Sequence, residues 1–237
     1  MLLVLWAVFT VAGVVFALIV PGQLMGPSAS NTMTEVERTF IVFSVASAPV
    51  AAAVWAVAVY SLMAWRRRGD WTEGDPDGPA LRGHGLTTGL WMFISSALCL
   101  FLLIWGLAAL SKVDSAAASS PNPLVVDVTG QQWVWTFSYP GQGVESDQLV
   151  LPLDRPVVFE VTSDDVIHSF WVPEMGIKVD ANPGMTTSTS TVPDRLGVYH
   201  VRCAELCGLL HADMETDATV MSTDDFDTWV AGQGGHA

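Results

Sequence analysis

Four side chains that can bind metal stand close together near the C-terminus, in the order Cys203, Cys207, His211 and Met214. Thiolate, imidazole and thioether groups form a soft to borderline donor set. Such a set favours copper over magnesium or calcium, because those two ions prefer oxygen ligands. His168, within the sequence DVIHSFWVP, is a further candidate ligand. The pattern therefore predicts a metal site assembled from two separate stretches of the chain.

The spacing of the two cysteines leaves several interpretations open. Thiols four positions apart in an exported domain can pair as a disulfide, or they can bind zinc, although zinc sites rarely recruit methionine. Histidine and cysteine with a weak axial methionine would form a mononuclear blue-copper set, for which the second cysteine is surplus. Two neighbouring thiolates can instead each bridge two metals, which makes a binuclear copper site the sharper hypothesis.

Two longer motifs resemble subunit II of the haem-copper cytochrome c oxidases. Residues 168–184 read HSFWVPEMGIKVDANPG, and residues 203–214 read CAELCGLLHADM. The resemblance covers the C-terminal domain, about half of the chain. It implies a binuclear copper site with ligands from His168, Cys203, Glu205, Cys207, His211 and Met214. In this arrangement the cysteines bridge the two ions, each histidine binds one ion, the methionine is a weak ligand and the glutamate contributes its backbone carbonyl.

The resemblance carries two further expectations about single residues. It implies that the Glu205 side chain faces a magnesium ion at the interface with subunit I, whereas chemistry alone allows an exposed loop carboxylate. The aromatic run at 131–139, QQWVWTFSY, resembles the tryptophan-rich strand of the family. That likeness implies that an electron enters from cytochrome c at Trp133. The alternative is a core strand in which Trp133, Trp135 and Phe137 share one face, and the two interpretations are compatible.

Three apolar stretches with almost no charge lie in the first half of the chain, at about 2–20, 40–65 and 90–110. Each is close to the ~20 residues that a helix needs to cross a bilayer. We therefore expect a transmembrane region at 1–112 and a separate domain at 113–237. The first stretch lacks a preceding Lys or Arg, which favours a retained helix. A cleaved signal peptide is the alternative, since Ser28-Ala29-Ser30 offers small residues for cleavage.

The charges at the membrane edges predict the topology. The second apolar stretch ends at Trp65-Arg66-Arg67-Arg68, and arginines at a membrane edge are typical of the cytoplasmic side. Residues 69–82 are rich in Gly, Pro and Asp and are expected to form a connector. The third stretch then runs outward. The sequence thus predicts an integral protein of the plasma (inner) membrane whose C-terminal domain is extracytoplasmic.

Beyond an expected Ser/Ala/Pro linker at 111–122, the pattern changes to short segments rich in Val, Thr and aromatic residues. These predict strands at 124–128, 131–139, 149–151, 157–162, 168–172, 185–192, 197–201 and 218–221. Many short strands favour a β-sandwich or barrel, and the family resemblance implies a cupredoxin-like Greek-key β-sandwich. A short helix is expected to close the chain, with Ser222 or Thr223 as its cap and Gly232 at its end.

The expected outer domain carries the acidity of the whole protein. Residues 113–237 contain 18 acidic and four basic side chains, a net charge of −14, which equals that of the full chain. A negative surface attracts a cationic partner in a salt-dependent way, which fits a c-type cytochrome with a basic haem edge. Asp164 and Asp165 are the nearest candidates for such a rim. Solubility or adaptation to a salty or acidic habitat is the alternative, and the acidity argues against a nucleic-acid partner.

Taken together, these features and the resemblance imply a subunit of a respiratory cytochrome c oxidase. It would accept electrons from cytochrome c and pass them to haem in subunit I, where oxygen is reduced to water with proton translocation, and subunit III would be a further partner. The third apolar stretch begins at His84-Gly85 without the Glu and Pro typical of the family, which puts proton uptake through this subunit in doubt. A membrane-tethered copper carrier is the alternative from another class.

Overall fold

The computed structural model of the protein describes residues 1–64, 83–118 and 122–236. The chain divides into two compact units. One contains Met1–Pro21 and Thr39–Leu107, and the other contains Gly22–Arg38 and Ala108–Ala237. The second unit therefore includes a segment that the sequence places between the first two apolar stretches. The arginine cluster at 66–68 and the connector at 69–82 lie outside the described residues.

The first unit is built from apolar helices that are long enough to cross a membrane by length and composition. They belong to α1 (Leu2–Ile19), α3 (Asn31–Ala64) and α4 (Gly85–Ala118), and a short helix, α2 (Pro21–Leu24), follows α1 in the chain. The Trp6 indole donates to the Pro49 carbonyl at 2.9 Å, so α1 and α3 pack together. Most side chains of the apolar windows are exposed to the surroundings, as expected for helices whose solvent is lipid.

Two helix boundaries differ from the sequence expectation. α3 begins at Asn31, well before the predicted apolar stretch, because Ser30 caps it: the Met33 N–H donates to Ser30 Oγ at 3.1 Å. α4 continues to Ala118, so the prediction of an irregular linker is wrong for residues 111–118. The alanines in this part of the chain have the highest intrinsic helix propensity, and they prolong the helix past the apolar stretch.

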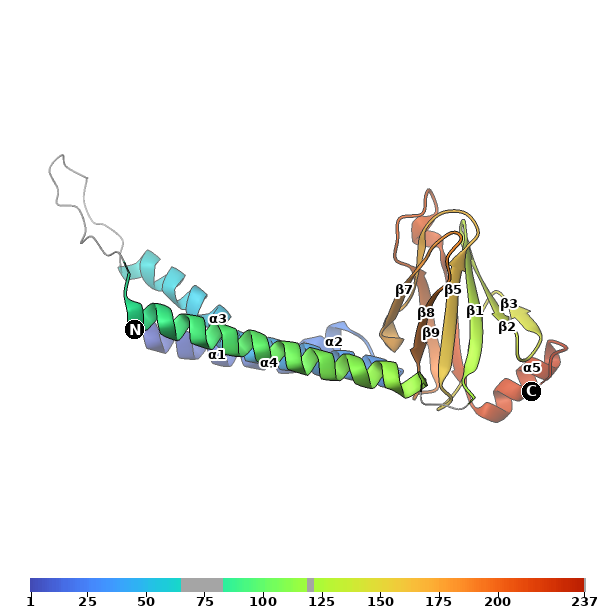
Figure 1. The fold of residues 1–237 in the computed structure, drawn as a ribbon, viewed down its shortest axis with the longest axis horizontal. Coiled ribbons are helices and arrows are strands. Elements are labelled where there is room, and N and C mark those ends of the chain that lie inside the picture. Colours follow the sequence, from blue (N-terminus) through green and yellow to red (C-terminus); the bar gives the residue numbers. More distant parts are fainter. Residues whose placement is uncertain (65–82, 119–121, 237) are drawn as a thin grey trace. The chain divides into compact units, whose positions relative to one another are not determined.

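The second unit is a sandwich of two five-stranded sheets (Figure 1). The first sheet has the order β3-β2-β1-β5-β8, and the second has the order β4-β10-β9-β6-β7. The strands are β1 (Leu124–Gln131), β2 (Val134–Tyr139), β3 (Val144–Ser146), β4 (Leu149–Pro152), β5 (Val157–Ser163), β6 (His168–Val172), β7 (Ile177–Ala181), β8 (Thr187–Thr191), β9 (Gly197–Cys203) and β10 (Glu215–Met221).

The core lies between the two sheets and is rich in aromatic rings. Along β1, buried and half-buried residues alternate, which gives one face to the core. Phe170 of β6 contacts rings from the opposite sheet, with centroid distances of 5.7 Å to Trp135 and 5.3 Å to Phe159. The polar strand β8 is at the edge of its sheet, where two polar faces are tolerated. The predicted membrane anchor with an all-β, cupredoxin-like domain is thus confirmed.

All eight predicted strands are present, 168–172 with the expected ends and the others with shifted ends, and the prediction missed β3 and β7. The expected strand at 131–139 is broken, because Gln132 and Trp133 form the two-residue turn between β1 and β2. The expectation that Trp133 shares a strand face with Trp135 and Phe137 is therefore wrong. Trp133 packs against the core from the turn, while the other two are buried in β2.

Two segments outside the sheets belong to the sandwich unit. The predicted terminal helix is confirmed as α5 (Thr223–Gly232), with Ser222 accepting the Asp225 N–H at 3.2 Å. Residues 28–33, far upstream in the sequence, also pack against the sandwich, and we call this segment the strap. Within the strap, Ala29 and Ser30 are fully buried. The Ala29 N–H donates to the Glu174 carbonyl at 2.8 Å, and the Ala29 carbonyl accepts the Asp194 N–H at 3.1 Å.

Candidate metal centre

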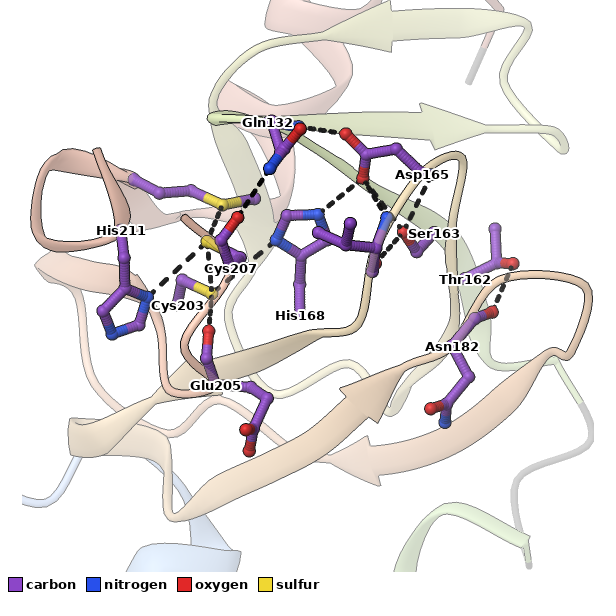
Figure 2. Close-up of polar contacts among 12 residues, drawn as sticks. Gln132, Thr162, Ser163, Asp165, His168, Asn182, Cys203, Glu205, Cys207 and His211 are labelled. Atoms are coloured by element: carbon purple, nitrogen blue, oxygen red, sulfur yellow. Dashed lines mark hydrogen bonds and ion pairs between the residues drawn. The ribbon is translucent and has the colours of Figure 1, made fainter. Parts of the chain in front are cut away.

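Strand ends bring the predicted ligands together. His168 is the first residue of β6 and Cys203 is the last residue of β9, and these two strands are antiparallel neighbours with Phe170 opposite Cys203. The loop from β9 to β10 carries Cys207, a 3₁₀ turn at His211–Asp213, and Met214. Residues separated by 35 positions thus meet at one end of the second sheet (Figure 2).

The donor atoms surround the two sulfurs. Cys203 Sγ and Cys207 Sγ are 3.7 Å apart, whereas a disulfide bond is about 2.05 Å long, so both thiols are free in this structure. His168 Nδ1 is 3.8 Å from the Cys203 sulfur. The Cys207 sulfur is 3.6 Å from His211 Nδ1 and 3.8 Å from the Met214 thioether sulfur.

Glu205 contributes differently from the other residues. Its backbone carbonyl is 3.2 Å from the Cys203 sulfur. Its side chain is exposed and points away from the sulfur pair (Figure 2). The carbonyl can therefore join the metal site while the carboxylate remains available to a second ion or a partner.

Because the candidate ligands are buried, the cysteines need a metal ion to become thiolates. His168 has no exposed surface, Met214 is 1% exposed, and the cysteines are 9% and 4% exposed. Burial, followed by the neighbouring Cys203 thiol, raises the pKa of Cys207 to about 11. A thiolate at this position is therefore unfavourable unless a metal ion stabilises it.

Asp165 orients one of the candidate ligands, a role that the sequence did not indicate. Its Oδ1 lies 2.8 Å from His168 Nε2, which leaves Nδ1 of the ring facing the Cys203 sulfur. Partial burial alone would raise the pKa of Asp165, but hydrogen bonds from the Gln132 N–H, His168 and the Val166 N–H lower it to about 2. Instead of simply forming an acidic rim, this carboxylate holds the imidazole in place.

Gln132 is the second residue that the sequence did not single out. Its side-chain amide donates to the Cys207 carbonyl at 2.7 Å, and its backbone N–H donates to Asp165 at 2.8 Å. The next residue, Trp133, lies so close to Gly208 that a Cβ there would stand 3.3 Å from the indole nitrogen. The turn between β1 and β2 is therefore packed directly against the ligand loop.

The donor set fits copper better than the alternative metals. The metal-binding atoms of His168, Cys203 and Cys207 all lie within 4.8 Å of one another, and all three residues are buried. Thiolate, imidazole and thioether together suit copper, whereas magnesium and calcium require oxygen. Two sulfurs at this separation, each with its own imidazole, can hold a pair of soft ions.

Comparison with known proteins places the domain in a family. Residues 142–220 match the family described as cytochrome C oxidase subunit II, periplasmic domain. The chain is 42% identical over 129 residues to cytochrome c oxidase subunit 2 of Thermostichus vulcanus, covering 52% of this chain and 39% of that protein. It is 33% identical over 212 residues to the protein of the same name from Alkalihalophilus pseudofirmus, covering 87% of this chain and 60% of the relative.

Solved structures include a protein of similar sequence. The periplasmic domain of subunit II of cytochrome oxidase from Bradyrhizobium japonicum is 30% identical and is covered over 96% of its length by 48% of this chain, with a TM-score of 0.46. The chain spans less than two thirds of the length of the two curated relatives.

Proposed function

Since the C-terminal domain of this chain belongs to the cytochrome c oxidase subunit II family, we propose that the protein is the electron-entry subunit of a respiratory cytochrome c oxidase. The observation that carries this proposal is the convergence of imidazole, thioether and carbonyl donors on two free thiols 3.7 Å apart. Such a set is suited to one-electron transfer, because both thiols and both imidazoles would be engaged as metal ligands.

The site would hold a binuclear copper centre. When bound, the two copper ions supply a centre that takes up and releases one electron at a time. Cys203 and Cys207 would hold the ions through their sulfurs, and His168, His211, Met214 and the Glu205 carbonyl would complete the ligand set. The chain's own contribution is rigidity, because the ligands come from strand ends and from a loop fixed to its neighbours. A stiff set of ligands changes little between two oxidation states, which lowers the barrier to transfer.

The partners follow from this role. A cationic c-type cytochrome would dock on the acidic domain and deliver electrons near Trp133. The electrons would continue to haem in subunit I, where oxygen reduction coupled to proton translocation takes place, and subunit III would complete the assembly. The exposed Glu205 carboxylate would bind magnesium at the interface with subunit I.

We also propose the location of the two parts. Three helices with the length and composition of membrane spans anchor residues 1–112 in the plasma membrane, and residues 113–237 form the domain on the outer side. A copper carrier is the weaker candidate, because a carrier must release its ion. Here His168 and Met214 are almost fully buried, which opposes release.

Spectroscopy of the full chain tests the copper centre. The protein, purified in detergent without other subunits, would be reduced, loaded with copper and oxidised. We expect two coppers per chain, a purple colour and an electron paramagnetic resonance spectrum of one unpaired electron shared by both ions. The same treatment of a Cys99→Ser variant should give the same spectrum, since Cys99 lies in α4. A single copper with a blue or colourless spectrum would overturn the proposal.

A further inference from the structure

Gln132 connects the turn that carries Trp133 to both ligand-bearing segments of the second sheet. Its side-chain amide reaches the Cys207 carbonyl, and its backbone N–H reaches Asp165, which in turn holds His168 (Figure 2). These contacts join residues 75 and 33 positions apart in the sequence.

The geometry of the turn makes this connection relevant to Trp133. The indole lies against Gly208, which directly follows Cys207 and has a φ of +130°. A Cβ at Gly208 would be 3.0 Å from the Gln132 amide nitrogen and 3.3 Å from two atoms of the indole. The ligand loop thus has room for the indole only because Gly208 has no side chain. The hydrogen bond from the Gln132 side-chain amide to the Cys207 carbonyl keeps the two backbone segments at this spacing.

We propose that Gln132 is a positioning residue whose side-chain amide, bonded to the Cys207 carbonyl, fixes the spacing between the Trp133 indole and the copper-binding loop. This inference rests on the proposed function. The step that it controls is a one-electron transfer: the reduced c-type cytochrome loses one electron and the oxidised metal centre gains it. No covalent bond forms or breaks, and no proton moves. The rate depends on the separation and contact between the indole and the loop, and Gln132 sets both.

A docking role for Gln132 makes a different prediction. Gln132 is exposed, so a partner cytochrome could contact it directly. Loss of a docking contact raises the donor concentration needed for half-maximal rate. Loss of a positioning bond lowers the rate at saturating donor and leaves the half-saturating concentration unchanged. The two roles are therefore separated by one titration.

The test uses the assembled oxidase with the variants Gln132→Leu and Gln132→Glu. Both remove the donor to the Cys207 carbonyl, and the second keeps the length and shape of the side chain. We expect the transfer rate at saturating reduced cytochrome to fall on the order of tenfold in both variants, with the copper spectrum retained. The added negative charge of Gln132→Glu should tighten donor binding at low salt, so that affinity and rate change in opposite senses.

A second readout does not depend on copper. In the metal-free full chain, the backbone amides that follow Cys207 should exchange with solvent faster in both variants, because the loop has lost its connection to the turn. Gln131→Leu is the matched control. Gln131 is an exposed amide side chain at the end of β1, next to the same turn, and its loss should leave rate and exchange unchanged.

Three results would overturn the inference. An unchanged transfer rate in both variants excludes a positioning role. A rise in the half-saturating concentration alone assigns Gln132 to docking. Loss of the copper spectrum in both variants would show that Gln132 supports the ligand loop itself rather than the spacing to Trp133. Failure of the proposed function gives a separate signature, since the unmodified protein would then lack the spectrum of a copper pair.

Discussion

The two sheets of the sandwich contribute to the site in different ways. Strands β6 and β9 of the second sheet, with the loop from β9 to β10, supply every candidate ligand. The first sheet supplies none, but its β1–β2 turn places Gln132 and Trp133 against the ligand loop. Under the proposed function, metal holding and electron contact would thus belong to different sheets. This separation suggests that either property can be changed while the other is retained.

The largest expected effect comes from a ligand in the second sheet. Cys207→Ser removes one bridging sulfur and leaves a hydroxyl, which is a poor ligand for copper. We expect complete loss of the two-copper spectrum, measured by copper content and electron paramagnetic resonance on the purified full chain. A shared-electron spectrum that survives this substitution would contradict the assignment of Cys207.

A substitution in the core between the two sheets should lower the stability of the whole domain. Phe170 is fully buried and contacts rings of Trp135, Phe137 and Phe159 in the opposite sheet. Phe170→Ala should lower the free energy of unfolding of the domain by about 3–5 kcal/mol, as large-to-small changes of buried aromatic residues do. Chemical denaturation followed by circular dichroism in detergent measures this. A loss below about 1 kcal/mol would show that the sheets are not held together through this ring.

The next effect concerns a hydrogen bond that joins the sheets and depends on pH. The Tyr139 hydroxyl of β2 donates to the Val150 carbonyl of β4 and accepts the Val150 N–H. Burial raises the pKa of Tyr139 above its usual value, and the contact with Val150 offsets part of the rise. The hydroxyl therefore stabilises the fold fully below about pH 10, the usual tyrosine value, and this stabilisation is lost as the pH rises through the folded-state pKa.

Tyr139→Phe should lower the free energy of unfolding at neutral pH by about 1–3 kcal/mol, the usual cost of leaving a buried polar group without its partner. It should also flatten the decline of stability above pH 10, because the titrating hydroxyl is gone. Equilibrium unfolding at a series of pH values measures both effects. An equally steep alkaline decline in the variant would show that another group is responsible.

The smallest expected effect comes from the contact residue of the first sheet. Trp133→Phe should slow oxidation of reduced cytochrome c on the order of tenfold, which corresponds to about 1.4 kcal/mol of activation free energy. The copper spectrum should remain intact, since Trp133 supplies no ligand. Stopped-flow kinetics with the assembled oxidase gives the rate, and Trp135→Phe is the control for a general change in the aromatic core. Unchanged turnover would remove Trp133 from the electron path.

The sequence was informative where a motif was compact and less informative where function depended on distant contacts. The residues around the two cysteines could be nominated because their spacing and type are unusual. His168 could be added because a familiar motif surrounds it. The roles of Gln132 and Asp165 could not be read in this way. A glutamine next to tryptophans and an aspartate in an acidic domain are ordinary until the fold brings them to Cys207 and His168.

One local pattern was misleading and another is compatible with two outcomes, each for a physical reason. The alternation of aromatic residues at 131–139 predicted one strand, but the chain reverses at Gln132-Trp133 without a Gly or Asn to mark the turn. The small residues at 28–30 matched a leader-cleavage pattern. In the structure the same small side chains fit a tightly packed contact, where Ala29 and Ser30 have no exposed surface. Small size satisfies both requirements, so sequence alone does not separate them.

The strap at residues 28–33 determines how the sandwich domain can be cut out for study. A fragment that starts at residue 113 would lose the bond from Ser30 Oγ to the Met175 carbonyl and the contact between Thr32 and Thr191. It would also uncover the surface that Met33 covers at Gly176. A soluble version should therefore carry residues 28–33 joined through a flexible tether or supplied as a separate peptide. Protein engineers can treat this segment as a detachable clip whose binding would report on the integrity of the sandwich.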